Sequence, residues 1–365
     1  MYLVNASNLH SGGGVQVAAS FINEFASLSY IENHKYIFLC STEVFDNLTE
    51  RTKSLLEILI YDFIGFRSLD NRIKEIFEDC EVCFTIFGPF YSHVKIKKHI
   101  TGFANPWLAD YKNSIIFERT TISWIKLYFK LLLQWYYFSL ADVLIVEQNS
   151  VRDKLLCLKR LRDKPIHVVS NAISSLYLKR EEWKVCVFPD MVNSITVGYL
   201  GRNYTHKNLA ILKSVNDVLL SKYSLGINFI FTLTDGEMDS LGFNSISNFY
   251  TVGKIKVEQC PSFYAQIDAT IFPSRLECFS ATPIESIYMD TPVICSDKDF
   301  VRDIFGDTLV YFDELSPDSI AEAIFNITTS GTKVDVDTAL AKLIVSNLPS
   351  SKDRAEKYME ILNLS

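Results

Sequence analysis

The chain has 365 residues, a formal net charge of −7 and an ordinary globular composition in which 48% of the residues are hydrophobic. This length exceeds that of one compact core, which predicts two α/β-sized domains, and the composition excludes a disordered chain. The acidic balance argues against a polyanion-binding surface over the whole protein, so nucleic acid is a poor candidate partner. The N-terminus lacks the basic stretch and apolar core of a secretory signal, and we expect a cytoplasmic protein.

Short apolar runs alternate with longer helical patterns throughout the chain. This alternation is typical of βαβ units, whose parallel sheets are buried on both faces. Five predicted strands make up a first α/β series: Tyr2–Asn5, Tyr36–Cys40, Val82–Ile86, Val143–Val146 and Ile166–Val169. Cys80 and Cys83 form a CxxC within this series, but no second pair or Cys/His cluster accompanies them. We therefore interpret them as core residues and expect no zinc site.

The first predicted strand runs into three consecutive glycines, Gly12, Gly13 and Gly14. Glycines permit close backbone approach to a ligand and positive φ angles. The pattern is neither GxGxxG nor a P-loop, so NAD or ATP binding is not supported. A ligand-facing loop and a purely structural turn are both open interpretations.

The middle of this series contains basic and apolar groups that could meet an anionic membrane surface. Val151–Lys164 carries six basic and two acidic residues, and Lys95, Lys97 and Lys98 form a second basic group. The stretch Ser123–Leu140 is apolar and aromatic, but it contains two lysines and precedes an apolar strand. We interpret this stretch as a buried helix and not as a membrane span.

The charged segment Leu178–Asn193 fits neither series of strands. A second series of predicted strands follows it: Ile195–Leu200, Asn228–Thr232, Asn248–Val252, Ala269–Phe272 and Pro292–Cys295. We place the domain junction in that segment, with an N-terminal domain over residues 1–185 and a C-terminal domain over 190–345. The helical pattern at 351–362 has no assigned docking partner, and packing back onto the first domain is one option. We expect the functional site in a cleft between the two domains.

Two constellations in the second domain indicate chemistry. Arg202 and Lys207 lie at a strand-to-helix junction, where two cations make a good clamp for a diphosphate. Glu277 and Glu285 lie at the end of a predicted strand and in the first turns of the next helix. Carboxylates there can accept hydrogen bonds from ribose and sugar hydroxyls, while free N–H groups at the helix start suit phosphate. The site suits a sugar nucleotide, although a solvated basic turn and a carboxylate that complements a helix dipole remain open alternatives.

Taken in order, these segments resemble family 4 of the GT-B glycosyltransferases, a large group of retaining enzymes. The most specific match is the E-x7-E motif of Glu277 and Glu285, within PSRLECFSATPIES. VGYLGRNYTHKN resembles the family's G-R and K-N segment, VSNAI its P-N-G-V segment, LADVLIVEQNSVRDKL its A-D helix entry, and VRDIFGDTLVYFDE its continuation. The resemblance covers nearly the whole chain and implies two Rossmann-like parallel-sheet domains facing across a cleft.

The resemblance also implies roles for individual residues. Arg202 and Lys207 would bind the diphosphate, Glu285 the ribose and Glu277 the transferred sugar. Three further groups complete the implied site: backbone at Cys278, Phe279 and Ser280 near sugar and phosphate, the loop of Gly253, Lys254 and Ile255 at the base, and Gly13 and Gly14 facing the phosphates or the acceptor.

The sequence departs from the family pattern in two places. Cys278 and Ser280 replace the usual glycines. The His-Asp pair that many relatives carry in the first domain is missing, and the nearest candidates are His93 and the segment around Asn105 and Asp110.

The resemblance predicts a retaining, metal-independent hexosyltransferase that uses a UDP- or GDP-sugar and needs no cofactor. Its expected acceptor is a glycan, with a polyprenyl-diphosphate-linked glycan as one candidate, in the biosynthesis of a surface polysaccharide such as lipopolysaccharide O-antigen or capsule. The enzyme would be peripheral on the inner face of the cytoplasmic membrane. Two alternatives are a GT-B nucleotide-sugar epimerase or hydrolase, and a non-catalytic subunit that binds sugar nucleotides.

Overall fold

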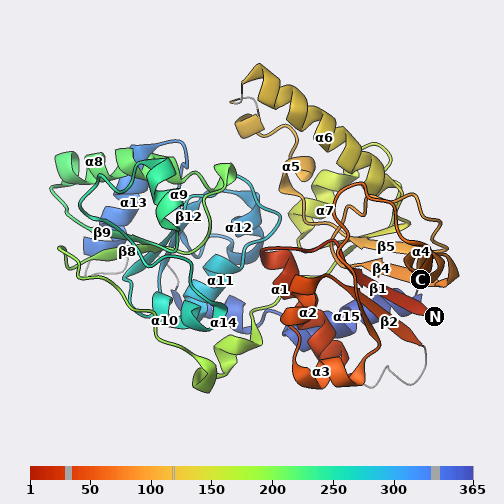
Figure 1. Ribbon diagram of the computed structural model, residues 1–365. Coiled ribbons are helices and arrows are strands. Elements are labelled where there is room, and N and C mark those ends of the chain that lie inside the picture. The colour runs from red at the N-terminus through yellow and green to blue at the C-terminus, as the bar shows by residue number, and fades with distance from the viewer. Residues whose placement is uncertain (29–34, 117, 119, 330–337, 365) are drawn as a thin grey trace. The chain divides into compact units, whose positions relative to one another are not determined.

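The computed structural model describes residues 1–28, 35–116, 118, 120–329 and 338–364, and they form two compact units. Unit 1 comprises Met1–Ala172 and Pro349–Ser365, and unit 2 comprises Ile173–Leu348 (Figure 1). The boundary lies ahead of the predicted junction between 185 and 190, because Tyr177 and Cys186 are buried in a cluster of unit 2.

Unit 1 is built on a parallel sheet of seven strands in the order β3-β2-β1-β4-β5-β6-β7. The strands are β1 (Tyr2–Ala6), β2 (Tyr36–Cys40), β3 (Ile58–Ile60), β4 (Val82–Thr85), β5 (His99–Gly102), β6 (Val143–Val146) and β7 (Ile166–Val168). The helices are α1 (Gly13–Phe25), α2 (Thr42–Asp46), α3 (Glu50–Leu55), α4 (Asn71–Asp79), α5 (Pro106–Ala109), α6 (Thr121–Ser139), α7 (Asn149–Leu156) and α15 (Ser351–Leu364).

Both faces of this sheet are buried, because alternate residues of one strand enter different core clusters. Val4 of β1 packs with α1 and α15, whereas its neighbour Leu3 packs with residues from α4. Burial on both faces, with alternate side chains on opposite sides of the sheet, explains why a strand such as β2, YIFLC, is apolar throughout. Cys80 and Cys83 are buried in the second of these clusters, as predicted.

The last helix, α15, packs on α1 of unit 1 (Figure 1). Phe21 and Tyr358 make an edge contact with ring centroids 5.3 Å apart. Arg354 is 3% exposed, and its guanidinium donates to Ser20 Oγ at 2.8 Å and to Asn171 Oδ1. These contacts bring the two ends of the chain into one core, although more than 300 residues separate them along the sequence.

Unit 2 is built on a parallel sheet of six strands in the order β10-β9-β8-β11-β12-β13. The strands are β8 (Thr196–Tyr199), β9 (Asn228–Phe231), β10 (Phe249–Thr251), β11 (Ala269–Phe272), β12 (Val293–Ser296) and β13 (Val310–Phe312). The helices are α8 (Leu212–Tyr223), α9 (Asp235–Leu241), α10 (Cys260–Tyr264), α11 (Ala281–Tyr288), α12 (Asp299–Phe305), α13 (Pro317–Thr329) and α14 (Thr338–Ser346).

Two features differ from the sequence predictions. Strands β3, β5 and β13 were not predicted, because β3 and β13 have only three residues each and β5, HITG, has a single aliphatic residue. The prediction of a buried helix over Ser123–Leu140 is wrong. That segment forms α6, but Leu131, Tyr137 and Phe138 are its only buried residues, because one side alone packs on unit 1. None of the described helices is long and apolar enough to cross a membrane.

Candidate functional site

The strand order of unit 2 determines which edge of its sheet can bind a ligand. The chain moves outward from β8 through β9 to β10 and then returns to β11 on the other side of β8. At such a switch of direction, the connections that leave the carboxyl ends of the two central strands diverge to opposite faces of the sheet. The loops after β8 and β11, residues 200–208 and 273–280, therefore form the candidate site of this unit.

Arg202 lies in the first of these loops and is held by Glu237 of α9. Its Nη2 lies 2.6 Å from Glu237 Oε2, and its side chain is about one-third exposed. Burial raises the pKa of Glu237, but hydrogen bonds from Thr234 and Asn203, together with the charge of Arg202, outweigh it and lower that pKa. Arg202 is thus a fixed cation with part of its guanidinium accessible, as a phosphate ligand requires.

Lys207 and Glu277 are brought together from the two loops. Lys207 Nζ lies 2.5 Å from Glu277 Oε1, and their side chains are only 15% and 11% exposed. The backbone N–H of Arg275 donates to the carbonyl of His206 at 2.8 Å, which ties one loop to the other. The ammonium also lies 5.3 Å from the centre of the Phe272 ring. Two predicted site residues therefore form one enclosed ion pair at the end of β11.

His206 lies beside this pair and was not among the predicted site residues. Its Nε2 lies 3.9 Å from Glu277 Oε1. Burial lowers the pKa of His206, with Lys207 acting in the same direction and Glu277 opposing it. The sequence signal that could have identified it is its position directly before Lys207 in THKN, but a single histidine in a turn does not by itself indicate a functional site.

Glu285 lies within α11, surrounded by tyrosines. The Tyr264 hydroxyl donates to Glu285 Oε2 at 3.1 Å. Burial raises the pKa of Glu285, while the hydroxyls of Tyr177 and Tyr264 oppose the shift. The carboxylate is oriented by neutral donors and not by a cation, so it can accept a further hydrogen bond from a ligand hydroxyl.

The segment between Glu277 and α11 carries the predicted backbone contacts. Cys278 is buried, Phe279 packs against a core cluster that includes Phe272, and Ser280 precedes the helix. Ser280 does not accept a hydrogen bond from the helix through its side chain, and the first turn of α11 has no acidic residue. The leading N–H groups of the helix are therefore not capped by side chains of this segment, which suits a phosphate oxygen.

Gly253, Lys254 and Ile255 follow β10, two strands from β8 at the edge of the sheet. Gly253 has φ +69°, a Cβ added to it would meet no atom within 4 Å, and its N–H donates to Thr251 Oγ1 at 2.9 Å. Ile255 packs on the cluster that contains Tyr177 and Tyr264. The loop is thus linked through these tyrosines to Glu285.

Unit 1 has an equivalent switch between β1 and β4, and the glycine loop lies there. Gly12 has φ +72°, and Gly13 opens α1 with no atom within 4 Å of where a Cβ would lie. Gly14 is enclosed instead, because an added Cβ would lie 3.3 Å from Leu9 and 3.6 Å from Phe87. Gly13 can therefore face a ligand, whereas Gly14 is required for packing.

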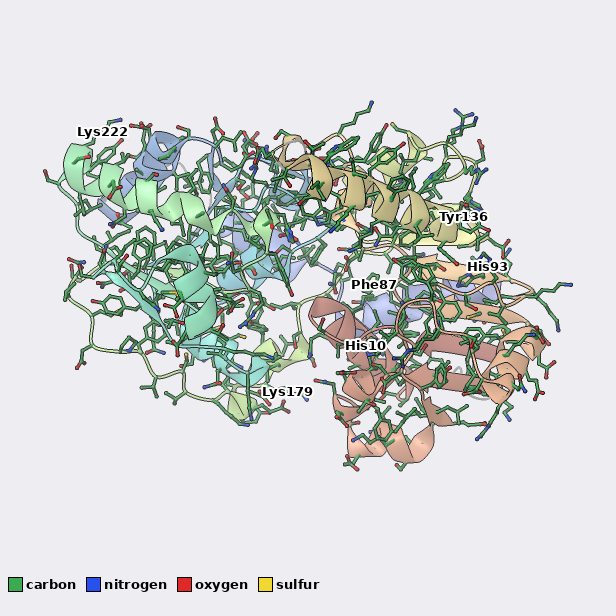
Figure 2. The ribbon with its side chains drawn as sticks, turned by 45° about the horizontal axis from the view of Figure 1, so that its top comes forward. His10, Phe87, His93, Tyr136, Lys179 and Lys222 are labelled. Carbon is green, nitrogen blue, oxygen red and sulfur yellow. The ribbon has the colours of Figure 1, made fainter. Side chains whose placement is uncertain are left out.

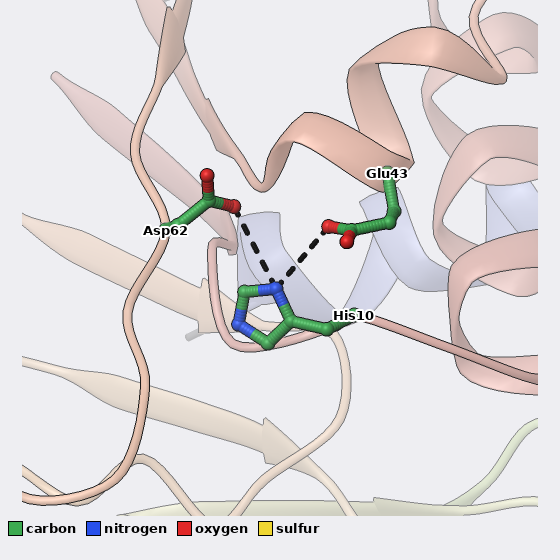
Figure 3. A group of neighbouring side chains, drawn as sticks. All are labelled: His10, Glu43 and Asp62. Carbon is green, nitrogen blue, oxygen red and sulfur yellow. Dashed lines mark hydrogen bonds and ion pairs between the residues drawn. The ribbon is translucent and has the colours of Figure 1, made fainter.

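One group among the described residues has the composition of a metal site: His10, Glu43 and Asp62 (Figure 3). His10 and Asp62 lie in the segments that follow β1 and β3, and Glu43 lies in the first turn of α2, which follows β2. His10 Nδ1 lies 3.2 Å from Glu43 and 3.6 Å from Asp62, and Nε2 lies 3.1 Å from the Phe63 carbonyl. A carbonyl only accepts, so Nε2 carries a proton. Nδ1 alone therefore faces the two carboxylates, and metal independence stays a prediction.

The first-domain candidates named from the sequence have other contacts. His93 Nε2 lies 3.0 Å from the Tyr137 hydroxyl, and its ring centroid lies 5.8 Å from that of Tyr136, with the two rings tilted by 55°. Figure 2 labels His93 and Tyr136. Asn105 caps α5 and donates to Gln134 at 2.9 Å, and Asp110 pairs with Lys154 at 3.6 Å. His10 is the histidine found beside the glycine loop, and it was missed because its two carboxylate neighbours are distant in sequence.

Comparison with protein families gives one match: residues 192–335 match the model described as glycosyl transferases group 1. This range includes both loops of the candidate site in unit 2. No curated protein matches the chain in a sequence comparison.

Solved structures match over both units. A glycosyltransferase from Rickettsia africae ESF-5 is 14% identical, with a TM-score of 0.66, over 100% of this chain and 98% of the other. Sucrose-phosphate synthase from Thermosynechococcus elongatus is 12% identical, with a TM-score of 0.69 and coverage of 100% and 99%. HepE from Anabaena, solved with UDP and glucose, is 12% identical, with a TM-score of 0.66 and coverage of 99% and 98%. These likenesses show the predicted GT-B fold, two parallel-sheet α/β units.

Proposed function

Since residues 192–335 place the chain in the glycosyl transferases group 1 family, we propose that this glycosyltransferase moves a hexose from a nucleotide-sugar donor to a glycan acceptor with retention of configuration. The observation that carries the proposal is the convergence of Lys207, Glu277 and the uncapped start of α11 where β8 and β11 end. These groups supply a cation, a hydroxyl acceptor and free N–H donors, which together match a sugar diphosphate.

The donor would lie along the carboxyl edge of the unit 2 sheet. Lys207 has three N–H donors, so it can keep its contact with Glu277 and still bind a phosphate oxygen. Arg202 likewise has donors left beyond its contact with Glu237. Both cations are held in place before the donor arrives, which lowers the entropic cost of binding.

The rest of the donor has candidate contacts in the same unit. Glu285 would accept from the ribose, and the open loop of Gly253, Lys254 and Ile255 would hold the base. Glu277 would contact the transferred sugar, with the backbone of Cys278, Phe279 and Ser280 nearby. HepE was solved with UDP, so a UDP-sugar is the first donor to test, with GDP-sugars second.

In the proposed reaction, the bond between the anomeric carbon and the diphosphate oxygen breaks, and the oxygen keeps the electron pair. The acceptor hydroxyl attacks from the same face and forms the new glycosidic bond, while its proton passes to the departing diphosphate. Lys207 and Arg202 stabilise the charge that develops on that oxygen. The products are a lengthened glycan and a nucleoside diphosphate, and the reaction needs neither a metal nor a cofactor.

The acceptor would be bound by unit 1, near the glycine loop. Gly13 opens toward solvent, and His10 lies in the same loop with two carboxylates that can accept from sugar hydroxyls. The basic groups at Lys95–Lys98 and Val151–Lys164 support a polyprenyl-diphosphate-linked acceptor and a peripheral position on the cytoplasmic membrane. Synthesis of a surface polysaccharide, such as O-antigen or capsule, is the pathway that fits these features.

The proposal is tested by measuring nucleoside diphosphate release from a panel of UDP- and GDP-sugars, with and without a lipid-diphosphate glycan. We expect acceptor-dependent release that is lost in Glu285→Ala and Lys207→Met. Lys222→Met is the matched control, because Lys222 forms an exposed ion pair on α8 with Asp318. Release without acceptor would indicate an epimerase or hydrolase instead, and nucleotide binding without release would indicate a non-catalytic subunit.

A further inference from the structure

Helix α6, labelled in Figure 1, exposes an apolar stripe along one side. Ile122 is 70% exposed and Phe129 is 65% exposed, which is unusual for side chains of this size. The stripe recurs at intervals of three and four residues, so its members share one face of the helix. Its members are Ile122, Ile125, Phe129, Leu132, Leu133, Tyr136 and Leu140.

Apart from Tyr136, whose ring centroid lies 5.8 Å from that of His93, the stripe is not the side on which α6 packs against the rest of unit 1. The packed side carries Leu131 and Phe138, and Gln134 there accepts a hydrogen bond from Asn105 at 2.9 Å. Leu131 lies about half a turn from Phe129 and Leu133 around the helix axis. The orientation of α6 therefore leaves the apolar stripe facing outward, and a continuous exposed apolar surface of this kind marks an interaction site.

Positive charge borders the stripe. Lys126 and Lys130 are exposed along one flank, and the sequence of α6 contains no Asp or Glu. A basic turn adjoins the helix, because Trp135 Nε1 donates to the Lys159 carbonyl at 3.0 Å and the Arg160 guanidinium lies 5.2 Å from the Trp135 ring. Arg162 of the same turn is also exposed. In a chain with a net charge of −7, this local excess of cations favours an anionic partner.

We propose that α6 is a membrane-docking helix that lies in the plane of an anionic lipid surface, with its apolar stripe among the acyl chains near the headgroups. An interfacial helix of this type combines an apolar face with lysines that reach the headgroups, and it does not span the bilayer. A second copy of this chain is a poorer occupant, since two such stripes placed face to face would bring Lys126, Lys130 and the basic turn against their own copies.

This assignment extends the proposed function, because it gives a lipid-linked acceptor a route to unit 1. That link rests on the proposed function, whereas vesicle binding does not require the chain to be an enzyme. The two can therefore fail separately. Donor turnover without vesicle binding would overturn the docking surface alone, and vesicle binding without turnover would overturn the proposed function alone.

The test is co-sedimentation of the full chain with phosphatidylcholine vesicles that contain or lack phosphatidylglycerol. We expect binding that requires the anionic lipid and weakens with salt. Ile125→Ser/Phe129→Ser should reduce the partition coefficient at least about 100-fold, since two large side chains no longer enter the lipid. Lys126→Ser/Lys130→Ser should reduce it about 30-fold, from roughly fivefold for each charge near the surface.

Leu220→Ser/Lys222→Ser is the matched control, because both side chains are exposed on α8 of unit 2. It should bind vesicles like the wild type, and all variants should keep the wild-type thermal unfolding midpoint. A tryptophan introduced into the stripe by Phe129→Trp measures depth independently, because brominated lipid should quench its fluorescence more strongly than that of the wild type. Absence of binding to anionic vesicles, or equal binding by the α6 variants, would overturn the proposal. So would a concentration-dependent dimer that the α6 substitutions abolish.

Discussion

Two buried titratable groups of unit 1 should make its stability respond to pH in opposite directions. Glu147 follows β6 and is 7% exposed; burial raises its pKa to about 7, although the charge of Arg354 and a hydrogen bond from Asn171 act against the shift. His99 begins β5 and is 8% exposed; burial lowers its pKa to about 4, with Asp142 opposing the shift and Lys164 adding to it.

The signs follow from which state binds more protons. Glu147 titrates at about 7 when folded and at 4.5 ordinarily, so its contribution to stability is complete below 4.5 and is lost as the pH rises through 7. His99 titrates at about 4 when folded and at 6.5 ordinarily, so its contribution is complete above 6.5 and is lost as the pH falls through 4. Each shift corresponds to about 3 kcal/mol of unfolding free energy. Between pH 4.5 and 6.5 the loss of stability from Glu147 and the gain from His99 largely cancel as the pH rises.

Glu147→Gln removes one of the two titrating groups, so the pH dependence that His99 contributes can be measured without it. The difference in unfolding free energy between the variant and the wild type isolates Glu147, because groups common to both proteins cancel. We expect the variant to gain about 3 kcal/mol relative to the wild type as the pH rises from 4.5 to 8. Across pH 4 to 6.5, the variant alone should show the rising stability that His99 contributes.

The assay is urea unfolding followed by tryptophan fluorescence at a series of pH values. Trp107, Trp124 and Trp135 lie in unit 1, so a Trp183→Phe background reports that unit. Glu75→Gln, on the exposed face of α4, controls for the loss of one negative charge. A free-energy difference for Glu147→Gln that does not change with pH would refute the assignment of a buried, reluctantly ionised carboxyl group.

Other variants test the remaining contacts. Lys207→Met should lower the turnover rate about 100-fold at saturating donor, since a cation at the leaving group is lost; wild-type turnover would contradict this role. Glu277→Gln should bind nucleoside diphosphate about tenfold more tightly by calorimetry while turnover falls, because Lys207 is no longer neutralised. Arg354→Met should lower the unfolding free energy of unit 1 by about 3 kcal/mol at pH 8, where Glu147 is left charged without its cation; an unchanged urea midpoint would contradict it. Gly253→Val should cost about 1 to 2 kcal/mol in thermal unfolding because of φ +69°, and Gly236→Val, without a positive φ, is the comparison.

Much of the fold was readable from the sequence, because long apolar strands buried on both faces produce continuous runs such as Tyr36–Cys40. Strands β3 and β13 were missed, since each has only three residues and lies at an edge of its sheet, paired with a single strand. The apolar pattern of α6 also led to a wrong prediction, that of a buried helix. An apolar helix is ordinarily assigned to the core, and the sequence alone does not reveal that its apolar stripe faces away from unit 1.

The candidate site was predictable at the level of residues but not of contacts. Glu277 and Lys207 were each recognised from their own segment, and only the adjacent placement of β8 and β11 brings their side chains together. His10 escaped notice for the same reason, because Glu43 and Asp62 approach it through strand order and not through spacing. Sequence motifs therefore identified groups from single loops, whereas pairs across loops required the topology.

The charges at the unit 2 site form matched pairs before any ligand arrives. Arg202 pairs with Glu237, Lys207 with Glu277, and Lys298 with Glu314 at 2.7 Å. The loop after β8 is fixed at both ends. At its start, the Gly201 N–H donates to Thr232 Oγ1 at 2.9 Å, and at its end, Asn208 donates to the Glu314 carbonyl at 2.7 Å. A site with unpaired cations would repel itself and attract any anion. Paired cations hold their positions. If the donor binds as proposed, its phosphate would approach Lys207 and its sugar hydroxyls Glu277, so an intact nucleotide sugar should bind better than a simple phosphate, which would have to compete with Glu277 for Lys207.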